Sequence, residues 1–142
     1  KLRLALEEHC FEPEIIIEPE PKNTAPAILA AALKIQQEND DALLLICPSD
    51  HLIEDNSDFL NSVLKGIKAA TENHLVLFGV QPSEPHTGYG YIDILQKEET
   101  KELSVRGFIE KPCKDDAEKM FASGNYFWNS GVFLTKASLL ID

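Results

Sequence analysis

Apolar residues in the first half of the chain form short unbroken runs, separated by longer segments in which they recur every three or four positions. The unbroken runs predict buried strands, at residues 14–18, 42–47 and 75–80. The periodic segments predict helices, at residues 2–10, 27–35 and 56–70. Asn23 or Thr24 would cap the second helix, and Asn56 or Ser57 would start the third. Apolar strands alternating with helices predict an α/β fold, a Rossmann-like, mostly parallel mixed sheet with helices on both faces.

The second half of the chain has a different pattern, richer in glycine and aromatic residues. Its predicted strands are residues 89–95, 103–109 and 126–134, and its predicted helix is residues 114–123. The polar residues 96–102 predict a solvated hairpin tip between the first two of these strands. No internal repeat or low-complexity linker divides the chain, so a single domain is expected.

Composition restricts the classes of partner. The 142 residues carry a net charge of −11, with 44% hydrophobic and 26% charged residues, which is typical of a soluble globular domain. Such an acidic chain argues against nucleic acid and against an anionic membrane surface as partners. The three cysteines are odd in number and far apart, which argues against a disulfide framework or zinc site and favours the cytoplasm. The chain starts with Lys1 and stops within a predicted element, so we expect a fragment of a longer protein.

Polar clusters follow the predicted strands, where ligands of open parallel sheets bind. After the first strand come Glu18 and the pair Asn23-Thr24, which leads into a helix N-terminus. A carboxylate at Glu18 could accept both N1–H and N2–H of guanine, and the alternative is a rigid proline-rich loop with a capped helix. After the second strand, Asp50 could hold Mg²⁺ against phosphates, or could simply cap a turn.

Two further clusters lie in the second half. Gly88 and Gly90 permit close backbone approach to a ligand, or a tight turn into a strand, and they do not form the dinucleotide-binding fingerprint. Glu110 and Asn129 could hold sugar hydroxyls and Lys111 a phosphate. Tyr126 and Trp128, beside Asn129, are equally compatible with core aromatic residues.

Taken in order, the clusters resemble those of mannose-1-phosphate guanylyltransferases, and are most similar to the bacterial branch, which often carries a C-terminal phosphomannose isomerase domain. The matching segments are EPEPKNTAPAI at 18–28, PSDH at 48–51, TGYGYI at 87–92, EKP at 110–112 and WNSG at 128–131. No single segment is specific, but five in this order are. The resemblance covers residues 18–133, most of the chain.

The resemblance implies transfer of GMP from GTP to mannose 1-phosphate, giving GDP-mannose and pyrophosphate with Mg²⁺ as cofactor. By the match, Asp50 would be the metal ligand and Lys111 would contact the sugar phosphate, so these two carry the catalytic assignment. The nucleotide-binding residues would be Glu18, Asn23, Thr24, Pro48 and Ser49. The sugar-binding residues would be Gly88, Glu110 and Asn129.

The chain also departs from the family pattern. The family begins with a glycine-rich loop that holds the triphosphate, yet the first glycine here is Gly66, and a second metal-binding Asp is expected beyond residue 142. We therefore interpret residues 1–142 as part of a single nucleotidyltransferase domain, incomplete at both ends and inactive by itself. Two alternatives stay open: a sugar-1-phosphate nucleotidyltransferase for another base or sugar, and a non-catalytic sugar-nucleotide-binding module. A homo-oligomer is also left open.

Overall fold

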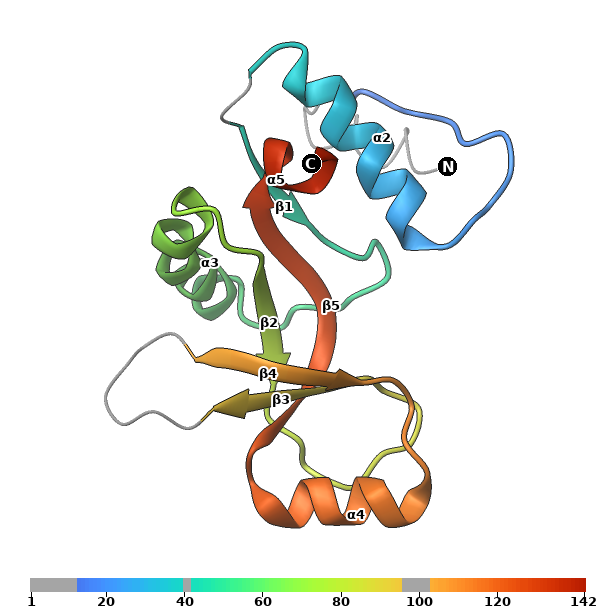
Figure 1. Cartoon of the computed structure of the whole chain (residues 1–142), viewed down its shortest axis with the longest axis vertical. Coiled ribbons are helices and arrows are strands. Elements are labelled where there is room, and N and C mark those ends of the chain that lie inside the picture. The colour runs from blue at the N-terminus through green and yellow to red at the C-terminus, as the bar shows by residue number, and fades with distance from the viewer. Residues whose placement is uncertain (1–12, 40–41, 96–102) are drawn as a thin grey trace.

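The computed structural model describes residues 13–39, 42–95 and 103–142, which form one five-stranded sheet with helices packed around it (Figure 1). In chain order the elements are α2 (Thr24–Gln36), β1 (Leu43–Ile46), α3 (Asn56–Thr71), β2 (Val76–Val80), β3 (Tyr91–Leu95), β4 (Ser104–Ile109), α4 (Lys114–Ser123), β5 (Tyr126–Lys136) and α5 (Ala137–Ile141). Each of these except α5 lies at a predicted position. The predicted helix 2–10 and hairpin tip 96–102 lie outside the described residues.

The long strand β5 organises the sheet. β1 and β2 both pair with the same stretch of β5, Phe133 and Leu134 included, so they lie on its two edges. β3 pairs with the beginning of β5, and β4 continues the sheet beyond β3. The mixed α/β class is confirmed. The predicted predominance of parallel pairing is not seen among the described residues, where every pairing is antiparallel, because β5 lies between β1 and β2, which run in the same direction.

Helices cover both faces of the sheet, as predicted. Directly opposed residues of an antiparallel pair lie on the same face, and consecutive residues lie on opposite faces. α2 packs on Leu44, which is paired with Thr135. Gly66 of α3 faces Val76 and Leu134, which are paired with each other. Because Leu134 and Thr135 are consecutive, α2 and α3 cover opposite faces.

The predicted strand at residues 14–18 is wrong. This segment has no regular secondary structure, and Ile17 is 84% exposed. A strand needs a neighbour for its backbone N–H and C=O groups, and no described strand pairs with this segment. Three consecutive isoleucines indicate burial, but they do not say which surface covers them.

A side-chain cap fixes the start of α3, and a different local bond lies at the start of α4. The Asp55 carboxylate accepts from the backbone N–H of Ser57 at 2.8 Å at the start of α3. Cys113 is the N-cap residue of α4, and its thiol donates to Asp116 Oδ2 at 3.2 Å. This hydrogen bond lowers the pKa of Asp116, and the Lys119 ammonium, 3.3 Å away, lowers it further.

Within the described ranges, no helix has the length and apolar character needed to cross a membrane.

Candidate functional site

A β-bulge in the middle of β5 shapes the candidate site. The register between β2 and β5 shifts at Phe78, which faces residues 130–132 of the longer strand. The Ser130 hydroxyl donates to the Phe78 carbonyl oxygen at 2.5 Å and so closes the bulge. Gly131 has a φ of +73°, a conformation that other residues adopt only with strain. The WNSG motif therefore bends β5 between the half that pairs with β1 and the half that pairs with β3.

Asn129 links this bulge to the start of β3. Its backbone N–H donates to the Gly90 carbonyl oxygen at 2.7 Å. Its side-chain Oδ1 accepts from the backbone N–H of Gly131 at 3.1 Å. A backbone N–H can only donate, so the amide oxygen must face Gly131. The side-chain NH₂ is then the group of Asn129 with which a sugar hydroxyl would bond.

Glu110, which follows the end of β4, lies close to Gly90. A Cβ atom at Gly90 would lie 2.8 Å from Glu110 Oε2 and 2.6 Å from Cζ of Phe108. A residue larger than glycine at this position would require both side chains to move. Lys111 Nζ lies 3.4 Å from Glu110 Oε1, and both side chains are mostly exposed. Such a pair contributes less than about 1 kcal/mol, so either charge remains available to a ligand.

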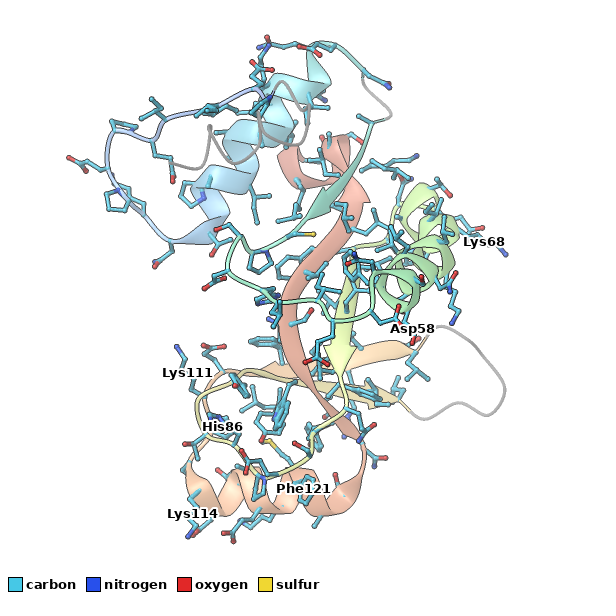
Figure 2. The ribbon with its side chains drawn as sticks, turned by 180° about the vertical axis from the view of Figure 1, so that it is seen from behind. Asp58, Lys68, His86, Lys111, Lys114 and Phe121 are labelled. Atoms are coloured by element: carbon cyan, nitrogen blue, oxygen red, sulfur yellow. The ribbon has the colours of Figure 1, made fainter. Side chains whose placement is uncertain are left out.

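Two of the predicted site residues have strained backbones. Asn23 has a φ of 63° and Lys111 a φ of 43°, whereas the third described non-glycine residue with positive φ, Asn73, follows the end of α3. Each such conformation costs on the order of 1–3 kcal/mol, and conformations of this kind concentrate at functional sites. The strain at Lys111 therefore supports its assignment, and Figure 2 shows Lys111 beside the hairpin of β3 and β4.

An aromatic cluster supports the segment between Gly88 and Gly90. The His86 ring stacks on Tyr89 with centroids 4.2 Å apart, and Tyr89 meets Trp128 edge-on at 5.1 Å. The backbone N–H of Gly88 donates to His86 Nδ1 at 3.0 Å. Sequence reasoning did not select His86. The signal that could have found it is its place two residues before Gly88, the spacing of a side-chain acceptor in a tight turn.

The loop that follows β1 reaches the bulge from the other side. Pro48 Cγ lies 3.3 Å from the point where a Cβ of Gly131 would be. Ser49 and Asp50 continue this loop as an exposed turn. At Cys47, the first residue of this loop, desolvation raises the pKa of the thiol. The structure thus brings Gly88, Gly90, Glu110, Lys111 and Asn129 together, with Pro48 adjacent; we call these six residues the bulge cluster.

The chemistry of Asp50 fits a magnesium ligand. It is an exposed carboxylate in the turn that follows the carboxyl end of β1. The described part of the chain holds no group of three or more His, Cys, Asp or Glu side chains arranged to bind a metal ion. Mg²⁺ commonly takes only one or two carboxylates and completes its shell with water and substrate phosphates, so a single Asp is compatible with it.

Glu18, Asn23 and Thr24 come from another segment of the chain than the residues of the bulge cluster. They belong to the segment that leads into α2, at the upper right of Figure 1. Among the described residues, no hydrogen bond or ion pair joins them to Asp50 or Glu110. The segment does line a cavity of about 380 Å³, formed by Ile16, Ile17, Glu18, Pro19, Glu20, Lys22, Pro26 and Ala30. The predicted base-recognition residues are thus exposed, and Glu18 faces a mostly aliphatic hollow.

Known proteins resemble this chain over nearly its whole length. The XanB xanthan biosynthesis protein of Xanthomonas campestris is 44% identical over 90% of the chain and 27% of its own length. A mannose-1-phosphate guanylyltransferase of Klebsiella pneumoniae is 43% identical over 87% of the chain and 27% of its own length. The chain therefore spans about a quarter of the length of these relatives.

A solved structure shares the fold as well. The Thermus thermophilus protein described as a mannose-1-phosphate geranyltransferase superposes with a TM-score of 0.86 at 28% identity, over 97% of this chain and 40% of that one. The model of the Nucleotidyl transferase family matches residues 3–141. That match includes the β5 bulge, the β1 loop and the segment before α2, and by it the chain belongs to the nucleotidyl transferase family.

Proposed function

We propose that the polypeptide carrying these residues transfers GMP from GTP to mannose 1-phosphate, giving GDP-mannose and pyrophosphate. The observation that carries the proposal is the bulge cluster, which gathers a carboxylate, an amide and two glycines beside a lysine and the β1 loop. The names of the relatives, one a mannose-1-phosphate guanylyltransferase, agree with it. We take residues 1–142 as part of one nucleotidyltransferase domain that works in the cytoplasm, with no nucleic-acid or membrane partner.

In the proposed reaction, an oxygen of the sugar phosphate attacks the α-phosphorus of GTP. A new P–O bond forms there while the bond from the α-phosphorus to the bridging oxygen breaks, and pyrophosphate leaves. Such chemistry depends mostly on positioning and on neutralising charge. Glu110 and the NH₂ of Asn129 would hold mannose hydroxyls over Gly88 and Gly90. Lys111 would hold the attacking phosphate.

The nucleotide would lie between the β1 loop and the segment before α2. Pro48 and Ser49 would contact the guanosine, and Glu18 with Asn23 and Thr24 would recognise the base. The start of α2 offers free backbone N–H groups and the positive end of a helix dipole to an anionic ligand. Asp50 would contribute one carboxylate to Mg²⁺, which when bound would neutralise phosphate charge.

Calorimetric titration of the chain with GDP-mannose in the presence of Mg²⁺ tests the proposal, with UDP-glucose and ADP-glucose as controls. We expect selective binding of GDP-mannose, and synthesis of GDP-mannose by the natural polypeptide that contains these residues. A Glu18→Gln variant should lose preference for guanine, because the amide replaces one of the two acceptor oxygens of the carboxylate with an NH₂ donor.

The outcomes separate the proposal from its alternatives. Tighter binding of UDP-glucose or ADP-glucose would assign another base or sugar. Selective binding by a natural polypeptide without any synthesis would point to a binding module. Failure of that polypeptide to bind any of the three, while it melts cooperatively, would overturn the proposal.

A further inference from the structure

The Gly88 turn is organised by one side chain that the proposed reaction does not use. His86 Nδ1 accepts from the backbone N–H of Gly88, two residues further along, at 3.0 Å. Asn and Asp side chains make the same bond in Asx turns. Because a backbone N–H only donates, Nδ1 must be unprotonated and the proton of the neutral ring must sit on Nε2. The turn therefore depends on one tautomer of this histidine.

Three kinds of contact fix the position of His86: a hydrogen bond to its backbone, ring contacts with two aromatic residues, and packing against Gly88. Its backbone carbonyl oxygen accepts from the hydroxyl of Tyr91 at 2.8 Å, and Tyr91 is fully buried. Its ring stacks on Tyr89 and meets Trp128 edge-on at 6.3 Å. The ring also covers Gly88, since a Cβ there would lie 2.8 Å from His86 Cε1. These contacts fix the acceptor nitrogen relative to β3 and β5, and not only relative to its own loop.

This fixed turn contains Gly88 and leads directly to the other residues of the bulge cluster. Two residues after Gly88, Gly90 lies under Glu110, and its carbonyl oxygen accepts from Asn129. We propose that His86 is a positioning residue, whose Nδ1 acceptor holds the Gly88–Gly90 backbone in the conformation that receives the sugar. The inference rests on the proposed function, because it concerns how the same cluster meets the sugar part of its ligand.

Two substitutions separate the acceptor from the ring. His86→Phe keeps an aromatic ring against Tyr89 but removes the acceptor, whereas His86→Asn keeps an acceptor at the same spacing but removes the ring. We expect His86→Phe to bind GDP-mannose about fivefold more weakly, the effect of losing about one neutral hydrogen bond, with GDP binding unchanged. His86→Asn should recover most of this loss. His74→Phe is the matched control, since His74 lies after α3 and contacts the Ala69 carbonyl oxygen, and it should bind as wild type.

The titrations use GDP-mannose and GDP as probes on the chain and on the natural polypeptide. Unchanged GDP-mannose binding by His86→Phe, or equal losses in both His86 variants, would overturn the role of the acceptor. Equal losses of GDP and GDP-mannose would also overturn it, because the effect would not concern the sugar.

A measurement on wild type needs neither a variant nor a ligand. Long-range ¹H–¹⁵N NMR of the neutral imidazole should show the proton on Nε2 and none on Nδ1. An Nδ1-protonated ring would refute the proposal even if GDP-mannose binds. The correct tautomer together with no GDP-mannose binding by wild type would instead count against the proposed function.

Discussion

Gly90 tests most directly how the bulge cluster is packed. In a Gly90→Ala variant, the new methyl group would lie 2.6 Å from Cζ of Phe108 and 2.8 Å from Glu110 Oε2. Ordinary contact begins at 3.4 Å, so the carboxylate oxygen must retreat by about 0.6 Å. Both side chains are partly exposed and can swing outward. We therefore expect a loss of stability of about 1 kcal/mol, at the low end for overpacking.

The displacement of Glu110 should reduce the free energy of GDP-mannose binding more than the free energy of unfolding. Hydrogen bonds to a charged group contribute about 1.5–3 kcal/mol, so a misplaced carboxylate should weaken GDP-mannose binding at least about tenfold. Binding of GDP should change little, because the nucleotide is assigned to other residues. Calorimetry with both ligands measures this difference, and urea unfolding followed by the fluorescence of Trp128, the only tryptophan of the chain, measures stability.

Gly107→Ala is the matched control on the neighbouring strand. The nearest atom to its new methyl group would be Cβ of Asp93 at 3.9 Å, an ordinary contact. Stability should stay the same or rise by about 0.4–1 kcal/mol, because alanine restricts the unfolded chain. The reasoning would be refuted if Gly90→Ala bound GDP-mannose as tightly as wild type. It would also be refuted if Gly107→Ala lost as much affinity for GDP-mannose as Gly90→Ala.

Three further predictions concern stability, each measured by denaturation of the chain. Gly131→Ala should destabilise more than Gly124→Ala, because both glycines have φ near +70° but only Gly131 also has a close neighbour; equal losses would mean that contact with the β1 loop is unimportant. Arg106→Met should lower the free energy of unfolding by about 1–2 kcal/mol, measured with urea. The reason is that two hydrogen bonds from Arg106, of 2.8 and 2.9 Å, satisfy the buried Asp93 carboxylate, and a decrease below about 0.5 kcal/mol would contradict this. The pKa of Asp116 is lowered in the folded state, first by the hydrogen bond from the Cys113 thiol at the N-cap of α4. The ionised carboxylate therefore stabilises the folded state above the ordinary pKa of an aspartate, and this stabilisation is lost as pH falls through the lowered pKa. The melting temperatures of wild type and Asp116→Asn should therefore converge as the solution is acidified, and a constant difference would exclude this linkage.

Local sequence determined most elements correctly because their signals are local. α3 begins where predicted, since Asp55 and the residues after it carry both the cap and the apolar spacing. The predicted bounds of α4 match the structure, where Gly124 ends the helix in the left-handed conformation. The strands β1 and β2 lie inside their predicted apolar runs. Such features involve residues a few positions apart, so the printed sequence contains them.

Strand pairing needed information that short segments lack. The apolar runs of β1 and β2 predicted buried strands, but they did not show that β5 lies between them. The isoleucines of residues 15–17 have the pattern of a buried strand, yet no described strand pairs with them. In both cases the partner is distant in the sequence, and periodicity describes one segment without naming the other.

The candidate site was also predictable from the sequence only in part. By itself, the sequence determined the residue types: carboxylates, an amide, a lysine and glycines in an order that resembles one family. Only the tertiary structure decided that Asn129 contacts Gly90, that the Glu110 carboxylate lies against Gly90, and that no hydrogen bond or ion pair among the described residues joins Glu18 to them. It also revealed His86, whose role depends on an acceptor nitrogen held by stacking. The physical reason is that a site consists of distances between side chains, and those distances are set by sheet register and by the β5 bulge, which no single motif specifies.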